Sequence, residues 1–120
     1  YVIMGAPSGI DAILVYFKEV LSLSPKAIKN LRIKINNVLK LPIDKVTLQQ
    51  FFTTIDKPCL VIHEISDSVT PIDPIKGAIE NLPHIDRVYI NGQDHMLKEQ
   101  ETIDIIQEFL KYKTIQNYVL

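Results

Sequence analysis

A short apolar run, bounded by a proline on one side and polar residues on the other, constrains this chain most. Residues 59–62 read Cys-Leu-Val-Ile and follow Pro58. Such a run, rich in branched side chains, is typical of a buried strand in a parallel sheet. Asp67 comes shortly after it. In open α/β sheets, ligands and catalytic groups collect beyond the carboxyl ends of the strands, so Asp67 is a candidate functional residue.

A second predicted strand, at residues 87–91, leads into the sequence Gly-Gln-Asp-His. Because parallel strands end at the same edge of a sheet, His95 is expected to reach Asp67, at about 2.6–3.2 Å between hydrogen-bonding atoms. A third strand pattern occupies residues 1–4. The sequence therefore predicts an α/β fold of three layers, with at least three parallel strands in sequential order and helices on both faces.

Helical patterns separate the predicted strands. Ser8 is interpreted as the N-cap of a helix that begins near residue 10, and Ser24 as the N-cap of a second helix that ends before Pro42. Further helices are predicted at residues 71–82 and 99–112, and residues 46–52 fit either a short helix or an extended segment. The positions expected to face inward in the first and last helices are Ile10, Ile13, Leu14, Phe17, Val20, Leu21, Ile103, Ile105 or Ile106, Phe109 and Leu110.

The two loops after the strands carry a family resemblance. Residues 63–71, His-Glu-Ile-Ser-Asp-Ser-Val-Thr-Pro, resemble the acid segment of α/β-hydrolases, often H-G-x-x-D-x-x-V-P, and residues 92–95 resemble that family's G-x-x-H loop. The chain differs at Glu64, where Gly is usual, and at Thr70, which adds a residue before the proline. The resemblance covers roughly residues 1–110. It implies that residues 1–120 are the C-terminal part of one α/β-hydrolase domain, with residues 9–45 as a helical cap insertion.

The resemblance also implies a nucleophile–His–Asp triad of a serine-esterase type, in which Asp67 is the acid and His95 the general base. It implies hydrolysis of an ester, thioester or amide of a small molecule, without a cofactor. The nucleophile is absent from the chain, because no G-x-S-x-G elbow occurs. Residues 5–9, Gly-Ala-Pro-Ser-Gly, have the wrong spacing, and Pro7 lacks a backbone donor just before Ser8. The nucleophile and oxyanion hole are therefore expected upstream of Tyr1.

The chain begins inside an apolar strand and without a methionine, so we expect a fragment of a longer protein. The fragment alone is expected to be inactive, and to associate with itself or with its own N-terminal half. The alternative interpretation is a non-catalytic binding or regulatory domain on a hydrolase-like scaffold. A genuine start codon or a stop codon just upstream of Tyr1 would favour that alternative.

Composition excludes several other classes of protein. Cys59 is the only cysteine, which fits a reducing, cytoplasmic location and a buried, inert thiol. No apolar run approaches the ~20 residues that a membrane span needs. The net charge is −1, and basic residues do not alternate with aromatic ones, so neither a membrane nor a nucleic-acid partner is expected.

A metal site is the remaining alternative. His63, Glu64 and Asp67 share letters with the zinc motif H-E-x-x-H, which requires two ligands one helical turn apart. Here the segment leaves a strand, so that geometry is lost and no metal is predicted. His63 is expected to be buried and hydrogen-bonded to a loop backbone group.

Overall fold

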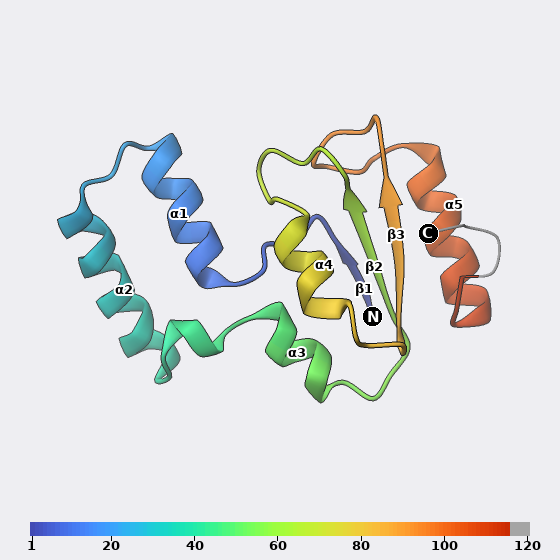
Figure 1. Cartoon of the computed structure of the whole chain (residues 1–120), viewed down its shortest axis with the longest axis horizontal. Coiled ribbons are helices and arrows are strands. Elements are labelled where there is room, and N and C mark those ends of the chain that lie inside the picture. The colour runs from blue at the N-terminus through green and yellow to red at the C-terminus, as the bar shows by residue number, and fades with distance from the viewer. Residues whose placement is uncertain (116–120) are drawn as a thin grey trace.

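Three parallel strands form the centre of the computed structural model, which describes residues 1–115 (Figure 1). They are β1 (Val2–Met4), β2 (Cys59–Glu64) and β3 (Ile85–Ile90), in the spatial order β1-β2-β3. Met4 pairs with Ile62, and Glu64 pairs with Ile90. All three strands therefore end at one edge, and the predicted parallel, sequential order is confirmed.

Helices cover both faces of the sheet. Leu60 and Ile62 of β2 face α5 (Gln100–Tyr112), where they pack in one cluster with Ile105 and Phe109. The alternate β2 residues, Cys59 and Val61, pack in a second cluster with Phe52 of α3 (Leu48–Thr54) and with Ile75 and Ile79 of α4 (Asp73–Ile79). Side chains point to alternate faces along a strand, so the continuous apolar run in β2 contributes residues to the core on both faces of the sheet. All six β2 residues are buried.

Two further helices, α1 (Ile10–Val20) and α2 (Pro25–Leu39), lie to one side of the sheet (Figure 1). The short 3₁₀ helix η1 (Ile43–Lys45) connects α2 to the rest of the chain. Ser24 caps α2 as predicted, since its side chain accepts a hydrogen bond from the Ala27 N–H at 3.2 Å. That residues 9–45 act as a cap over a catalytic site stays a prediction. No helix within residues 1–115 is both long and apolar enough to cross a membrane.

The predicted N-cap at Ser8 is wrong. Helix α1 begins after Gly9, which has extended backbone angles, and no side chain caps it. The backbone explains the difference, because the Ser8 carbonyl accepts a hydrogen bond from the Leu48 N–H at 2.9 Å and Gly9 forms a bridge with Thr47. Ser8 therefore belongs to an extended connection held against the start of α3.

Several predicted inward positions are also wrong. Only Leu14 is buried in α1, while Phe17, Val20 and Leu21 are 40–60% exposed. In α5 the buried face consists of Thr102, Ile105 and Phe109, and the predicted inward residues Ile103 and Leu110 are exposed. Periodicity identified these helices correctly but could not tell which part of a broad apolar stripe meets the sheet.

Candidate active site

Asp67 and His95 lie side by side beyond the carboxyl ends of β2 and β3. Asp67 Oδ2 and His95 Nδ1 are 2.8 Å apart, so the predicted contact is confirmed. The Asp67 side chain is fully buried, and the His95 side chain is 32% exposed. An ionised carboxylate can only accept hydrogen bonds, so Nδ1 carries the proton of a neutral imidazole. Nε2 is then left as a proton acceptor, and no residue in the described part of the chain bonds to it.

Three donors besides His95 surround the Asp67 carboxylate. Oδ1 accepts hydrogen bonds from the backbone N–H groups of Val69 and Thr70, at 2.8 and 2.9 Å, and Oδ2 lies 2.9 Å from the Thr70 hydroxyl. Burial alone raises the pKa of this carboxyl group, but the hydrogen bonds from His95, Thr70 and Val69 outweigh burial and lower the pKa to about 2. Asp67 is therefore ionised at neutral pH.

This low pKa predicts a contribution to stability that depends on pH. The Asp67 pKa falls from 3.8 to about 2 on folding, so its contribution is complete above pH 3.8 and is lost as the pH falls through about 2. A shift of this size corresponds to roughly 2 kcal/mol. Urea unfolding of the native chain and of Asp67→Asn, between about pH 5 and about pH 2, measures it. The difference in unfolding free energy should shrink as pH falls; a constant difference would contradict the shift.

Thr70 links the acid loop to the end of β1. Its hydroxyl lies 3.0 Å from the Gly5 carbonyl and 2.9 Å from Asp67 Oδ2, so its single proton is shared between two acceptors. The Thr70 carbonyl lies 2.7 Å from Nε2 of His63, which is 1% exposed. The prediction that His63 is buried and bonded to a loop backbone group is confirmed. The residue that lengthens the loop relative to the hydrolase pattern thus ties three segments together.

Gly5 leaves room for the imidazole of His95. Its φ of +50° lies in the left-handed region that favours glycine. A Cβ atom at Gly5 would come within 3.0 Å of the His95 carbonyl oxygen and 3.3 Å of its ring carbon Cε1. A side chain there would push the histidine loop away, so Gly5 is part of the site although sequence reasoning did not select it.

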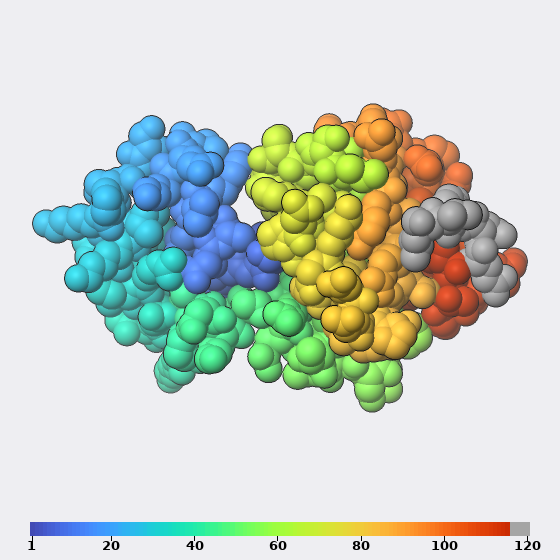
Figure 2. Space-filling view, viewed as in Figure 1, coloured from blue at the N-terminus to red at the C-terminus, as the bar shows by residue number. Residues whose placement is uncertain are grey.

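An apolar cavity of about 370 Å³ adjoins the Asp67–His95 pair. It lies between α1 and the segment after β2, where Figure 2 shows a hollow between the blue and the yellow-green atoms. Thr70 lines the cavity and contacts Asp67, so the cavity and the pair share a wall. None of the lining residues carries a formal charge; they are Pro7, Ser8, Ala12, Ile13, Val15, Tyr16, Phe17, Val69, Thr70, Pro71 and Pro74.

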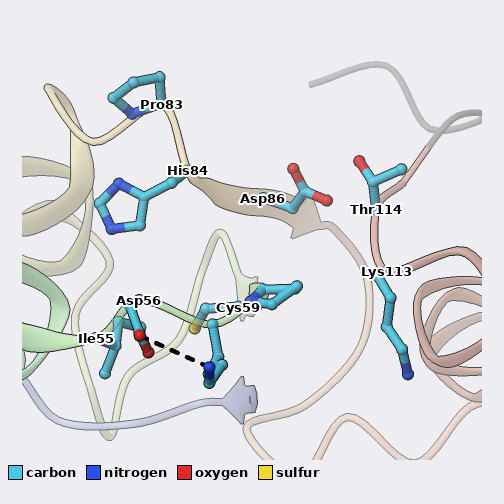
Figure 3. A pocket seen from close by; sticks show the side chains of 10 residues that line it. Ile55, Asp56, Cys59, Pro83, His84, Asp86, Lys113 and Thr114 are labelled. Carbon is cyan, nitrogen blue, oxygen red and sulfur yellow. Dashed lines mark ion pairs between the residues drawn. The ribbon is translucent and has the colours of Figure 1, made fainter.

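A second cavity, of about 480 Å³, lies at the opposite, amino-terminal edge of the sheet (Figure 3). Its walls include Cys59, Asp86 and Lys113, together with an ion pair between Asp56 and Lys57 at 3.6 Å. Burial raises the pKa of the Cys59 thiol, which keeps the thiol protonated and agrees with the predicted inert cysteine. This cavity contains neither member of the Asp67–His95 pair.

The remaining candidate residues lie apart from the pair. Asp94 Oδ1 accepts a hydrogen bond from the Met96 N–H at 2.8 Å, so the acid adjacent to His95 in sequence caps its own turn. Within residues 1–115, no three His, Cys, Asp or Glu side chains gather closely enough to hold a metal ion. Ser8 lines the apolar cavity, as described above.

Comparison with protein-family models gives no match to this chain, and comparison with curated proteins gives none either. Over residues 1–115, the chain forms a small α/β domain with a three-stranded parallel sheet. The resemblance to α/β-hydrolases therefore depends on the residues of the two loops and on their geometry. The catalytic roles of Asp67 and His95 stay predictions.

Proposed function

We propose that this chain supplies the acid and the general base of an α/β-hydrolase, and that the nucleophile belongs to a segment outside it. The observation that carries the proposal is the 2.8 Å contact between a fully buried, ionised Asp67 and a partly exposed His95. A structural ion pair has no need to keep one imidazole nitrogen free, whereas a general base does.

In the proposed reaction His95 Nε2 takes a proton from the nucleophile and later returns it to the leaving group. Asp67 holds the imidazole as the Nδ1–H tautomer and stabilises the imidazolium that forms. The charge of Asp67 is maintained by its three other donors, so the pair is ready at neutral pH. The substrate class is an ester, thioester or amide of a small molecule, and no cofactor takes part.

The apolar cavity beside Thr70 is the proposed place for an uncharged part of the substrate. Small-molecule sites are usually concave and apolar, with a few polar groups at one end. Here Thr70 lines the cavity and its hydroxyl bonds to Asp67, so Thr70 connects the cavity to the Asp67–His95 pair. We also propose a reducing, cytoplasmic location, since the only cysteine of the chain is buried and forms no disulfide.

The chain by itself is expected to be catalytically silent, because a general base without a nucleophile and an oxyanion hole cannot complete acyl transfer. Hydrolysis of a chromogenic short-chain ester should not exceed the uncatalysed rate, and a fluorophosphonate probe should not label the chain. Peptide mass spectrometry after labelling checks this. A covalent adduct on Ser8 would contradict the prediction and place the nucleophile inside the chain.

The coding sequence upstream of Tyr1 tests the proposal itself. A G-x-S-x-G pentapeptide between a predicted strand and a predicted helix would support a hydrolase. An upstream region that contains no such elbow, with neither Ser nor Cys nor Asp as the nucleophile, would refute the proposal. That second result would favour a non-catalytic binding domain on the same scaffold.

A further inference from the structure

Glu64 is a buried carboxylate that the proposed reaction does not use. It is the last residue of β2 and pairs in register with Ile90, the last residue of β3. The side chain of Glu64 is almost fully buried, with 2% of the residue exposed. In the α/β-hydrolase pattern that this loop resembles, the same position is usually glycine. Glu64 therefore stands between the starts of the two loops that carry Asp67 and His95.

Each carboxylate oxygen of Glu64 bonds to a different loop. Oε1 accepts a hydrogen bond from the backbone N–H of Ser66 at 3.2 Å, and Oε2 accepts one from the backbone N–H of Gln93 at 2.9 Å. Ser66 immediately precedes Asp67 in sequence, and Gln93 comes two residues before His95. One side chain thus spans the gap between the acid loop and the histidine loop.

Burial of a carboxylate is costly unless hydrogen bonds or an opposite charge compensate it. Within residues 1–115, no lysine or arginine forms an ion pair with Glu64. The hydrogen bonds from the two backbone N–H groups therefore compensate the cost of burying the Glu64 carboxylate. In return, the carboxylate satisfies two backbone donors that lie beyond the ends of the strands and have no strand partner. This exchange fixes the backbone one residue before Asp67 and two residues before His95.

The histidine loop has a second attachment on its other side. Gln93 Oε1 accepts a hydrogen bond from the Thr102 hydroxyl of α5 at 3.1 Å, and Gln93 Nε2 donates to Glu101 at 3.3 Å. Those contacts hold Gln93 to a helix and leave its distance from the acid loop undetermined. The Ile65 N–H bonds to the Ile90 carbonyl at 2.8 Å where the strands end, and the bonds of Glu64 extend this connection to Gln93 of the histidine loop.

We propose that Glu64 is a positioning residue, whose two backbone hydrogen bonds hold the acid and histidine loops at the separation at which Asp67 and His95 bond. The consequence for catalysis rests on the proposed function. The structural consequence does not, since it concerns the tautomer of His95 and can be measured without turnover.

The test compares Glu64→Gln with Glu101→Gln in the 120-residue chain. Gln has one oxygen in place of two, so E64Q leaves one loop N–H facing an amide donor. E101Q makes the same chemical change at an exposed residue that contacts the same Gln93 through its side chain. Long-range ¹H–¹⁵N spectra of ¹⁵N-histidine-labelled protein report the tautomer of His95 and the exchange of its Nδ1 proton.

In the native chain and in E101Q, His95 should be the Nδ1–H tautomer with a slowly exchanging proton. In E64Q we expect a mixture of tautomers and exchange faster on the order of tenfold, the effect of losing a hydrogen bond to a charged group. Unchanged exchange in E64Q, or an equal change in E101Q, would overturn the proposal.

Glu64→Asp covers the case in which E64Q does not fold. It keeps the charge but is shorter by one methylene, so it reaches one loop and should reproduce the E64Q spectrum. In the native chain, the amides of Ser66 and Gln93 should exchange on the order of tenfold more slowly than in an unstructured peptide. Unprotected amides at both positions would refute the proposal without any variant.

The outcomes separate this inference from the proposed function. If the His95 tautomer depends on Glu64, while a longer form of the protein stays active after loss of His95, the positioning role stands and the hydrolase proposal fails. If His95 is essential for activity but its tautomer is unchanged in Glu64→Gln, the hydrolase proposal stands and the positioning role fails.

Discussion

Replacing His95 with alanine, in a longer protein that also carries the nucleophile, is expected to lower kcat on the order of 10⁴-fold with little change in KM. An imidazole can both receive and return a proton. Two imidazoles lie beside Asp67 within residues 1–115, but that of His63, 3.6 Å from Oδ2, is buried and bonds to the Thr70 carbonyl, whereas that of His95 is partly exposed. His95 is not one of the residues that line the apolar cavity, so its loss should affect the chemical step more than substrate binding. Steady-state hydrolysis of a chromogenic ester measures both constants.

His84→Ala is the matched control. His84 lies at the opposite edge of the sheet, where Nε2 is 3.3 Å from the Phe52 carbonyl oxygen, and it lines the other cavity. The variant should keep kcat within about twofold of the native value, as expected for substitutions away from a functional site. Equal losses in both histidine variants would indicate a general effect on folding, and full activity of His95→Ala would refute the general base.

The sheet and the contact between Asp67 and His95 were predictable because both follow from short-range patterns. A continuous apolar run such as residues 59–62 is compatible with few environments other than a strand buried on both faces. Once two such strands are parallel, their carboxyl ends meet at one edge, and polar residues just beyond them are brought together. The 2.8 Å distance is the outcome of that topology.

The residues that support the pair were not predictable in the same way. Glu64 and Thr70 were noticed only as departures from a loop pattern, and their roles depend on which way individual N–H groups point after the strands end. Hydrophobic periodicity does not encode those directions. A partial signal was available for Glu64, because a carboxylate continuing a buried strand must find hydrogen-bond donors nearby.

The exposed face of α1 was mispredicted for a different reason. Its apolar spacing is that of a helix which buries a stripe, yet Leu14 alone is buried in α1. The neighbouring α2 has no buried residue at all, and its Val38 is 79% exposed. An apolar periodicity predicts that one face of a helix packs against a partner. It does not say whether that partner belongs to the same chain. This discrepancy leads directly to the expectation about association.

We expect this 120-residue chain to associate at micromolar concentration, beginning with the free edge of the sheet. Among the described strands, β1 pairs with β2 alone. The Tyr1 carbonyl and the Gly5 N–H bond to β2, so the alternating peptide groups of Val2 and Met4 point to the opposite, unpaired side. An apolar strand with a free row of donors and acceptors is a template for another strand.

The bare helix faces favour the same outcome. Val15, Phe17 and Val20 of α1 are 40–58% exposed, and monomeric proteins rarely leave large contiguous apolar patches in water. The radius of gyration is 15.9 Å, compared with about 14 Å for a compact domain of this length. The two helices thus extend away from the sheet instead of burying their apolar faces against it.

Sedimentation or light scattering of the 120-residue chain should therefore give a mass well above the 13.7 kDa of the monomer. Met4→Pro removes an N–H on the free side of β1 without removing a bond to β2, and should weaken edge pairing roughly tenfold. Val38→Glu, on the most exposed apolar position of α2, should weaken association only if the helix face is the contact. A monomer whose Val2 and Met4 amides are nevertheless protected from exchange would contradict the free edge, because those groups would then have partners within the chain.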